Sequence, residues 1–552
     1  MKTIIIGGVA GGMSAATRLR RLDEHADITV YEQGPHVSFA NCGLPYFIGD
    51  VIAQEQSLLV QTPDALLRRF RLSVKVNTRV VQIDLASRTI TARDVLTGEE
   101  LSDTYDALIL SPGAHPRVLD IPGAERAFSL RDVPDAVRIK SAIDEKQATT
   151  AVILGGGFIG VEMAENLRHR GLHVTIVQSG HTILPQFDPE MIEPFHASLR
   201  ANGVNIILGR TATEITHDEV VLTDGNRLPA DLVISSIGVV ADVVLAEEAG
   251  LRLSPAGGIW VDENHRTSDP AIYAVGDAAA KHSDLTGQDQ MVWLANLANR
   301  HGRAVADVIA GKPSPEHASQ GTGIIGAFGM VVAVTGLTEK AALGAGIPIL
   351  VAHAHPSSHA GYYPGAATLA LKIVFAPDTG RILGAQAMGT DGADKRIDVL
   401  ATAIYAGLTV DDLMNLELAY APQFGSAKDA VNQLGYVANN VWHKRTPSVQ
   451  WHELDARLAE GATLIDVRTS AENEAGDIPG AILIPVDELR SRLDEIPDGE
   501  VIVHCRVGQR GHTAAQVLLQ NGKNAHNLDG GWLTWRAGMD ARGRAQSMLT
   551  QQ

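Results

Sequence analysis

The sequence is poor in cysteine: its 552 residues contain only two, Cys42 and Cys505. Two cysteines so far apart cannot form the disulfide framework of a secreted scaffold, so we expect a reducing, cytoplasmic setting in which each thiol has its own function. Positive charge is also scarce, because 46 basic residues stand against 64 acidic ones and the formal net charge is −18. That balance argues against nucleic acid and anionic membranes as partners.

Long hydrophobic runs are missing as well. No stretch reaches the roughly 18 uninterrupted apolar residues that a transmembrane helix needs, so we expect no membrane span. The first six residues lead directly into glycines, which is typical of a buried strand and not of a signal peptide. At roughly 150 residues per domain, the length predicts three to four domains.

The pattern of strand, glycine loop, helix and strand occurs first near the N-terminus. A strand over 4–6 precedes the loop, a helix extends to about Leu22, and a second strand over 28–31 ends at an acid. Free amides and the positive end of the helix dipole bind a pyrophosphate, and an acid about 20 residues further on bonds a ribose hydroxyl. Val9 occupies the second glycine position of the usual pattern. The predicted nucleotide contacts are Gly7, Gly8, Val9, Ala10, Gly11, Gly12 and Glu32.

The same pattern returns over strands 151–154 and 173–177, with a helix from Val161 to about Arg170 between them. Gln178 stands at the acid position, and it can still bond a neutral ribose hydroxyl. A 2′-phosphate would require an arginine, which residues 179–181 do not offer, so the sequence favours NADH over NADPH. Two such units imply two dinucleotide sites on doubly wound α/β domains. The predicted contacts are Gly155, Gly157, Phe158, Ile159, Gly160 and Gln178.

A third segment, 267–277, predicts a strand that ends in a turn at Asp277. Together with the two glycine loops it resembles the second flavin motif of the pyridine nucleotide-disulfide reductases, whose terminal Asp bonds the ribityl chain of FAD. The resemblance covers roughly residues 1–440 and implies FAD in the first unit and NADH or NADPH in the second. The implied domains are an FAD-binding domain split over 1–115 and 245–320, an NAD(P)H-binding domain over 116–244, and an α+β dimerisation domain over 321–444.

Cys42 lies in the segment Ser-Phe-Ala-Asn-Cys-Gly-Leu-Pro-Tyr at 38–46. A lone cysteine is commonly a small buried apolar residue. This one follows the flavin unit, and a helix that starts just after it would favour a thiolate through its dipole. With no cysteine nearby, we expect no local disulfide. Its oxidised form then involves an outside thiol, a sulfane sulfur, or oxygen as a sulfenic acid.

This segment resembles the single-cysteine branch of the family, which includes coenzyme A-disulfide and persulfide reductases together with NADH oxidases and peroxidases. The first helix places three polar residues on one face at i, i+4 and i+7, and residues 68, 69 and 71 add three arginines. Such arginines are either a solvated face or a site for a small polyanion such as the phosphates of CoA. The resemblance implies a CoA channel lined by Ser14, Arg18, Arg21, Ser38, Asn41, Asn299 and Lys428.

Tyr362 and Tyr420 lie beside prolines, where tyrosines are commonly packing residues. The resemblance implies instead that two such tyrosines reach across a homodimer to the cysteine of the other subunit, so that the active sites are shared. Tyr363 is a close rival to Tyr362 for this role. Histidines at 353, 355 and 359 do not follow a common zinc spacing, and we expect no metal there.

Cys505 ends an apolar strand that begins at 501, and a helix is predicted over 513–519. Such a loop can aim successive amides at one sulfur, while Arg506 and Arg510 add positive charge that stabilises a thiolate or persulfide. The short Cys-x4-Arg loop favours sulfur chemistry, and residues 449–540 resemble the rhodanese domain, which implies an α/β domain over 449–552. Gly511 replaces the small hydroxyl residue often found after that arginine.

The whole arrangement resembles a CoA-disulfide or persulfide reductase fused to a rhodanese. This implies that electrons pass from NAD(P)H through FAD to Cys42 and cleave a CoA persulfide, polysulfide or disulfide. Thiol and hydrogen sulfide are released, and Cys505 carries sulfane sulfur. Two alternatives stay open: an NADH oxidase or peroxidase that uses a Cys42 sulfenic acid, and a redox-sensing sulfur-delivery protein.

Overall fold

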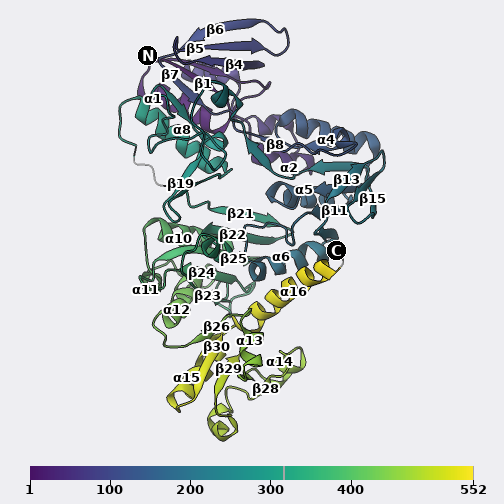
Figure 1. The fold of residues 1–552 in the computed structure, drawn as a ribbon, viewed down its shortest axis with the longest axis vertical. Coiled ribbons are helices and arrows are strands. Elements are labelled where there is room, and N and C mark those ends of the chain that lie inside the picture. Colours follow the sequence, from purple (N-terminus) through teal and green to yellow (C-terminus); the bar gives the residue numbers. More distant parts are fainter. Residues whose placement is uncertain (315–317, 551–552) are drawn as a thin grey trace. The chain divides into compact units, whose positions relative to one another are not determined.

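The computed structural model describes residues 1–314 and 318–550, with side chains to residue 546 at the C-terminal end (Figure 1). The chain forms two compact units. The first comprises residues 1–178 and 210–321, and the second comprises residues 179–209 and 322–552. No helix in the described part of the chain combines the length and apolar character that a membrane crossing requires.

The first unit contains a five-stranded parallel sheet in the order β18-β7-β1-β2-β3. Its central strands are apolar over residues 4–6 and 107–110 because both faces are covered, as parallel sheets require. Helices α1 and α8 lie side by side at one face, and Gly302 allows a close approach: a Cβ there would lie 2.1 Å from the Gly11 carbonyl oxygen. The elements are β1 (Lys2–Ile6), α1 (Ala10–Leu22), β2 (Asp27–Tyr31), β3 (Ser73–Lys75), β7 (Ala107–Leu110), β18 (Ile272–Ala274) and α8 (Ala295–Ile309).

A second parallel arrangement in the same unit has the strand order β11-β10-β16-β9. Both glycine loops thus connect a central parallel strand to a helix, and the predicted pair of Rossmann-like units is confirmed. The elements are β9 (Phe128–Ser129), α4 (Val133–Lys146), β10 (Thr150–Leu154), α5 (Phe158–His169), β11 (His173–Gln178) and β16 (Leu232–Ser235).

Smaller elements complete this unit. Two three-stranded antiparallel sheets, β4-β5-β6 and β13-β14-β15, and two two-stranded ones, β8-β17 and β19-β20, flank the parallel sheets. Their bounds, with those of the short helices, are α2 (Leu44–Ile48), α3 (Pro63–Phe70), β4 (Thr78–Asp84), β5 (Thr89–Asp94), β6 (Glu100–Thr104), β8 (Ala114–Pro116), β13 (Ala212–Ile215), β14 (Glu219–Leu222), β15 (Arg227–Pro229), β17 (Val239–Ala241), α7 (Val244–Glu248), β19 (Lys281–Ser283) and β20 (Gln288–Gln290).

The second unit is built first around an antiparallel sheet in the order β21-β22-β25-β24-β23. Strands β24 and β25 are buried along their whole length, which explains why apolar and small residues fill them except at Lys372 and Gln386. The elements are α6 (Pro189–Ala201), β12 (Val204–Leu208), β21 (Gly323–Ala327), β22 (Met330–Gly336), α9 (Glu339–Gly344), β23 (Leu350–Ala354), β24 (Ala370–Phe375), β25 (Ile382–Gly389), α10 (Ala393–Tyr405), α11 (Val410–Asn415) and α12 (Ala430–Trp442).

The C-terminal residues of this unit add a parallel sheet in the order β26-β30-β29-β27-β28. The long last helix, α16, lies beside α6 (Figure 1). The predicted C-terminal α/β organisation is confirmed. Its elements are β26 (Ser448–Val449), α13 (Leu454–Ala459), β27 (Thr463–Asp466), α14 (Ser470–Glu474), β28 (Ile482–Leu483), β29 (Glu500–His504), α15 (Gln509–Gln520), β30 (Asn524–Leu528) and α16 (Gly531–Thr550).

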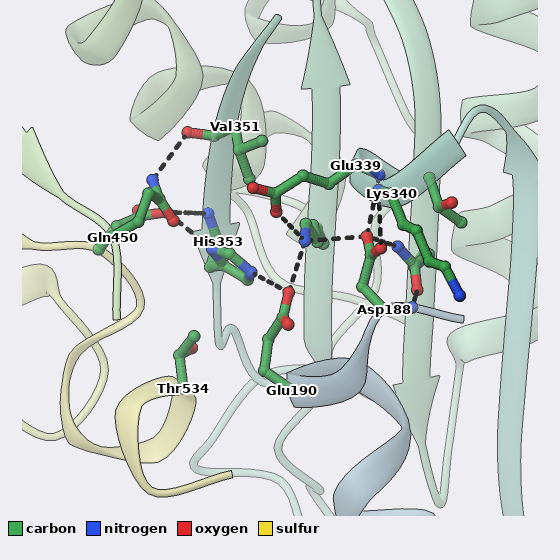
Figure 2. A network of polar contacts seen from close by, with 12 residues as sticks. Asp188, Glu190, Glu339, Lys340, Val351, His353, Gln450 and Thr534 are labelled. Carbon is green, nitrogen blue, oxygen red and sulfur yellow. Dashed lines mark hydrogen bonds and ion pairs between the residues drawn. The ribbon is translucent and has the colours of Figure 1, made fainter. Parts of the chain in front are cut away.

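A lysine buried in the antiparallel sheet ties α6 and α9 to β24. The Nζ of Lys372 lies 2.9 Å from Asp188, 2.5 Å from Glu190 and 2.7 Å from Glu339 (Figure 2). These carboxylates form the one acidic cluster among the described residues whose spacing would suit a metal ion, and the ammonium group fills it. Burial opposes the lysine charge, but the carboxylates outweigh that effect and raise the pKa of Lys372 above its ordinary value.

Replacing Lys372 by Met is expected to lower the stability of the second unit strongly. The substitution leaves buried carboxylates without their cation, and removal of one partner of a buried ion pair costs about 3–5 kcal/mol. Thermal unfolding followed by circular dichroism measures the effect. Lys340→Met is the matched control, because it removes the same kind of charge next to Glu339 from a side chain that is exposed to solvent. Equal unfolding temperatures for the two variants would contradict this account.

Candidate active sites

The first glycine loop is fixed by contacts that only glycine permits. Gly7 has φ +97°, and a Cβ there would lie 2.0 Å from the Ser111 carbonyl oxygen. At the end of β2, the Glu32 carboxylate accepts hydrogen bonds from the amides of Gly8 and Gly34, both at 2.8 Å. Burial raises the pKa of Glu32 despite these bonds. The predicted acid is therefore positioned directly against the predicted phosphate loop.

Asp277 follows β18, the strand at the edge of the same sheet. Its carboxylate is partly buried 4.0 Å from the Arg131 guanidinium, and burial raises its pKa. The buried Lys281 donates to the carbonyl oxygens of Gly276 and Ala279, both at 2.5 Å, and burial lowers its pKa to about 8. A Cβ on Gly11 would contact Val275 at 3.0 Å, so this segment adjoins the glycine loop. A carboxylate held beside a phosphate loop fits a ligand with hydroxyl and phosphate groups.

The second glycine loop repeats the arrangement with an amide in place of the acid. The Gly156 amide donates to Gln178 Oε1 at 2.9 Å. A Cβ on Gly160 would lie 2.1 Å from the Gly155 carbonyl oxygen, so the fold itself requires glycine there. In contrast, a Cβ on Gly157 would meet nothing within 4 Å. Its missing side chain therefore leaves space for a group outside the chain, as a bound pyrophosphate requires.

Cys42 lies in a short 3-10 helix, Asn41–Gly43, immediately before α2. Asn41 Oδ1 accepts from the Cys42 amide at 3.0 Å and lies 3.7 Å from its sulfur. The predicted helix after the cysteine is confirmed. The expected lowering of the thiol pKa is wrong for the chain alone: although Cys42 is exposed, the surrounding chain partly desolvates the thiol and raises its pKa, and the carboxylates of Glu162 and Asp277 add to this. A five-residue helix is a weak opposing dipole.

Glu162, on α5, is a site residue that sequence reasoning missed. Burial and the neighbouring Glu165 raise its pKa to about 7. Helix α2 packs directly on α5, where the Gly49 backbone lies against Asn166, and this contact brings Glu162 into the electrostatic environment of Cys42. Its position two residues after the last glycine of the loop was the available signal. A carboxyl that titrates near neutral pH can hold or release a proton.

The residues expected to bind CoA on α1 have partners on α8. Ser14 Oγ donates to Asn299 Oδ1 at 2.5 Å, and Arg18 bonds Asp307 at 2.6 and 3.0 Å. The pairing with Asp307 compensates much of the positive charge that the helix spacing suggested. Arg21 is exposed and lies over the Phe70 ring at 5.2 Å.

Other expected CoA contacts fall on loops. Ser38 has φ +48° and its amide donates to the Gly8 carbonyl oxygen at 2.8 Å, so it joins the glycine loop to the Cys42 segment. Lys428, in the second unit, is exposed next to the buried Asp429.

Tyr362 and Tyr420 lie together at the surface of the second unit. Their hydroxyl oxygens are 3.1 Å apart, and the residues are 77% and 50% exposed. Tyr363 instead makes an edge contact with the His359 ring at 5.7 Å. The two loops are tied to each other, because the Ala360 amide donates to the Pro422 carbonyl oxygen at 3.2 Å. Of the two rivals, Tyr362 is therefore the one that joins Tyr420 in a solvent-facing pair.

The histidines at 353, 355 and 359 have separate partners. His353 bonds Asp529 and Glu190, His355 bonds Thr534, and His359 contacts Tyr363.

Cys505 is fully buried at the end of β29, before a loop in which Gly508 has φ +90°. Arg510 forms a bidentate ion pair with Glu472 at 2.7 and 2.6 Å, and it holds the pKa of Glu472 at about 2. Its own pKa is raised by the hydrogen bonds to Glu472 and, in addition, by the electrostatic interaction with Cys505. Arg506, expected to share this role, is exposed at the surface. The predicted positive charge at the sulfur thus comes from one arginine, which a carboxylate holds in place.

Gly511 has a steric explanation. A Cβ at this position would lie 2.2 Å from Asn527 Oδ1 and 3.6 Å from the Cys505 amide nitrogen. The Asn527 side chain, which donates to the Gly508 carbonyl oxygen at 3.2 Å, thus occupies the space where a larger residue 511 would project.

Two nucleotide loops on parallel sheets and a lone cysteine before a helix define a flavin- and nicotinamide-dependent disulfide oxidoreductase. The chain belongs to the pyridine nucleotide-disulphide oxidoreductase family, which it matches over residues 1–305. Residues 327–431 match the dimerisation domain of that family, and residues 450–538 match the rhodanese-like domain. The predicted fold class is confirmed.

Three relatives are similar over most of the chain. The coenzyme A disulfide reductase of Staphylococcus epidermidis is 34% identical over 438 residues, which are 79% of this chain and 99% of that protein. The structure of reduced CoADR-RHD from Bacillus anthracis has 46% identity and a TM-score of 0.96, and 98% of each chain is covered. The structure of a NAD-dependent persulfide reductase from A. fulgidus has 34% identity and a TM-score of 0.90, and it covers 97% of this chain and 100% of that chain.

The two glycines of the second loop are expected to respond differently to alanine. Gly157→Ala should fold like the wild-type protein, since its Cβ enters open space, but should raise KM for NADH about tenfold. Gly160→Ala should lower the stability by about 1–3 kcal/mol, because its Cβ overlaps backbone. Unfolding temperature and NADH titration, measured on both variants, test the assignment. A Gly157→Ala protein with unchanged NADH affinity would contradict it.

Proposed function

We propose that this protein is an FAD-dependent reductase that passes electrons from NAD(P)H through Cys42 to a CoA persulfide, polysulfide or CoA disulfide. The observation that carries the proposal is the solitary Cys42 at the start of α2, in the same compact unit as both nucleotide loops. Cys42 and Cys505 are both free thiols, so the sulfur that Cys42 bonds during turnover comes from another molecule. The relatives named for CoA disulfide and persulfide reduction support this substrate class.

The site residues fit the two nucleotides of the family. Gly7 to Gly12, Glu32 and Asp277 would hold FAD, which supplies the relay that accepts a hydride and delivers two electrons to sulfur. Gly155 to Gly160 and Gln178 would hold the nicotinamide nucleotide. Because the carboxamide of Gln178 carries no charge and its oxygen already accepts from Gly156, we favour NADH.

The reaction balances in both forms. CoA disulfide, NADH and a proton give NAD⁺ and two CoA thiols, and CoA persulfide, NADH and a proton give NAD⁺, one CoA thiol and hydrogen sulfide. Cys42 attacks the substrate sulfur as a thiolate and forms a mixed disulfide or persulfide while a thiolate leaves. Glu162 is suited to take up the Cys42 proton, since its pKa of about 7 lies near ambient pH.

Substrate binding and dimer formation belong to the same proposal. Ser14, Arg18, Arg21, Ser38, Asn41, Asn299 and Lys428 are proposed to line the CoA channel. In a homodimer with shared active sites, Tyr362 and Tyr420 would donate hydrogen bonds to the thiolate that leaves at the partner subunit's cysteine. Their surface exposure supports this role. We also propose a cytoplasmic location, and an FAD-binding domain over 1–115 and 245–320, an NAD(P)H-binding domain over 116–244, a dimerisation domain over 321–444 and a rhodanese domain over 449–552.

Cys505 is proposed to carry sulfane sulfur, with Arg510 and the loop amides stabilising the persulfide anion. We propose that the exposed Arg506 attracts an anionic sulfur donor to this loop.

Cys42→Ser is expected to abolish NADH-dependent sulfide release and CoA disulfide reduction, since no other thiol can form the mixed disulfide. Cys505→Ser should leave CoA disulfide reduction within about twofold and should lose thiosulfate sulfurtransferase activity. Both are measured by NADH absorbance and by sulfide detection.

Assays under air and under argon separate the proposal from an oxidase. NADH consumption that requires oxygen, stops in Cys42→Ser and yields no sulfide would contradict a reductase. Negligible turnover with every disulfide and persulfide would favour a redox-sensing sulfur-delivery protein instead.

Tyr362→Phe is expected to lower kcat for CoA disulfide about tenfold or more with little change in KM, because the lost hydroxyl stabilises a charge that develops only during cleavage. Tyr363→Phe is the matched control and should stay within twofold of the wild-type rate. If the Tyr363 variant is the slower of the two, the assignment of the tyrosine is wrong.

A further inference from the structure

The start of α16 holds the rhodanese cysteine loop, residues 505–510, through backbone hydrogen bonds. The Trp532 amide donates to the Cys505 carbonyl oxygen at 2.8 Å, and the Leu533 amide donates to the Arg506 carbonyl oxygen at 3.1 Å. Gly531 has φ +65°, and a Cβ there would lie 2.4 Å from the Cys505 carbonyl oxygen. The loop that would carry sulfur therefore follows any movement of the first turn of α16.

Strand β23 holds the first turn of α16. This strand belongs to the antiparallel sheet β21-β22-β25-β24-β23, which we call the dimerisation sheet. The carboxylate of Asp529, two residues before α16, accepts from His353 Nδ1 at 2.7 Å and from the His353 amide at 3.0 and 3.2 Å. His355 Nε2 lies 2.7 Å from Thr534 Oγ1. Gly530 permits this approach, because a Cβ on it would lie 2.9 Å from the His353 Cβ and 2.0 Å from Thr534 Oγ1.

Buried charges fix His353 from its other side (Figure 2). Its Nε2 bonds Glu190 at 3.1 Å, and the same carboxylate oxygen accepts from Lys372 at 2.5 Å. Burial alone lowers the pKa of His353, but the carboxylates of Asp529 and Glu190 outweigh it and raise the value to about 9. The ring is therefore a cation held between two carboxylates, and the exposed fractions of all three side chains are 1–2%.

Gln450 gives Asp529 a further partner. Its Nε2 lies 3.1 Å from Asp529 Oδ2 and 3.3 Å from the Val351 carbonyl oxygen, so it bridges the same two segments.

We propose that His353 and Asp529 are positioning residues for sulfur transfer: the dimerisation sheet sets the geometry of the Cys505 loop through this pair. The inference rests on the proposed sulfurtransferase role of Cys505. It assigns the sheet a second function besides dimer formation, because side chains that hold a loop in place determine how closely its amides converge on a reacting atom.

The geometry of the histidine ring provides a matched pair of variants. An asparagine amide nitrogen falls near the position of Nδ1, so His353→Asn keeps a donor for Asp529 and loses the bond to Glu190. A glutamine amide nitrogen falls near Nε2, so His353→Gln keeps the bond to Glu190 and loses the side-chain bond to Asp529. Both variants remove the ring and its charge, so they differ in which carboxylate retains its partner.

The experiment measures thiosulfate:cyanide sulfurtransferase kinetics on the full-length holoenzyme. We expect His353→Gln to lower kcat at least tenfold with KM for thiosulfate within twofold, and His353→Asn to stay within about threefold of the wild type. Asp529→Ala should lower kcat like His353→Gln. Asp498→Asn, at a fully exposed acid of the same domain, is the surface control and should have no effect. Equal rates for the two His353 variants would overturn the proposal.

Hydrogen exchange of the loop amides over 505–510 gives a readout that does not depend on turnover. We expect at least tenfold faster exchange in His353→Gln than in His353→Asn, while strands β24 and β25 exchange alike in both. If the wild type transfers no sulfur, the function proposed for Cys505 is wrong. The exchange rates still show whether His353 and Asp529 position the loop. Unchanged loop exchange in His353→Gln and Asp529→Ala would overturn it. Should Asp529→Ala not fold, the two His353 variants alone carry the test.

Discussion

The structure of the first unit depends on the close approach of backbone at its two glycine loops. In each loop the backbone of a glycine with positive φ lies against a serine that follows a neighbouring strand, Ser111 in the first loop and Ser236 in the second. The amide of the next glycine donates a hydrogen bond to the residue at the end of the strand after the helix. The hydrogen bond uses Glu32 in one loop and Gln178 in the other. The same type of hydrogen bond holds the accepting side chain in both loops. The two sites therefore differ in the charge of that side chain, and this difference is what can distinguish the two nucleotides.

Much of this could be predicted from the sequence because the responsible signals are local. Strand, loop, helix and strand follow each other within about 30 residues, and apolar runs report burial on both faces of a parallel sheet. The helix after Cys42 and the loop at Cys505 were predictable for the same reason. Gly157 and Gly160 look alike in the sequence, however, and only the structure distinguishes the glycine that the fold requires from the one that faces open space.

What the sequence could not predict are the partners of charges across long separations. Arg18 was expected to offer a free cation, but Asp307, on a helix nearly 300 positions later, pairs with it. The three histidines on and after β23 suggested only a weak metal pattern, whereas His353 proved to be an ion-pair partner of Asp529 and Glu190. Spacing along the chain carries no information about such pairs, because they are created by packing between distant elements.

Sequence patterns also miss the balance between the effects that favour the Cys42 thiolate and those that favour the thiol. The dipole of α2 favours the Cys42 thiolate, but burial and the nearby carboxylates favour the thiol. A thiol with a raised pKa needs a proton acceptor at the moment of attack, and the Glu162 carboxyl, whose pKa burial raises to about 7, is a stronger base than an exposed carboxylate. Burial thus disfavours the anion at both groups, and transfer of one proton between them keeps a single negative charge in the site. Desolvation therefore has opposite consequences for the reaction at the two groups: it suppresses the resting thiolate and makes the neighbouring carboxylate a better base.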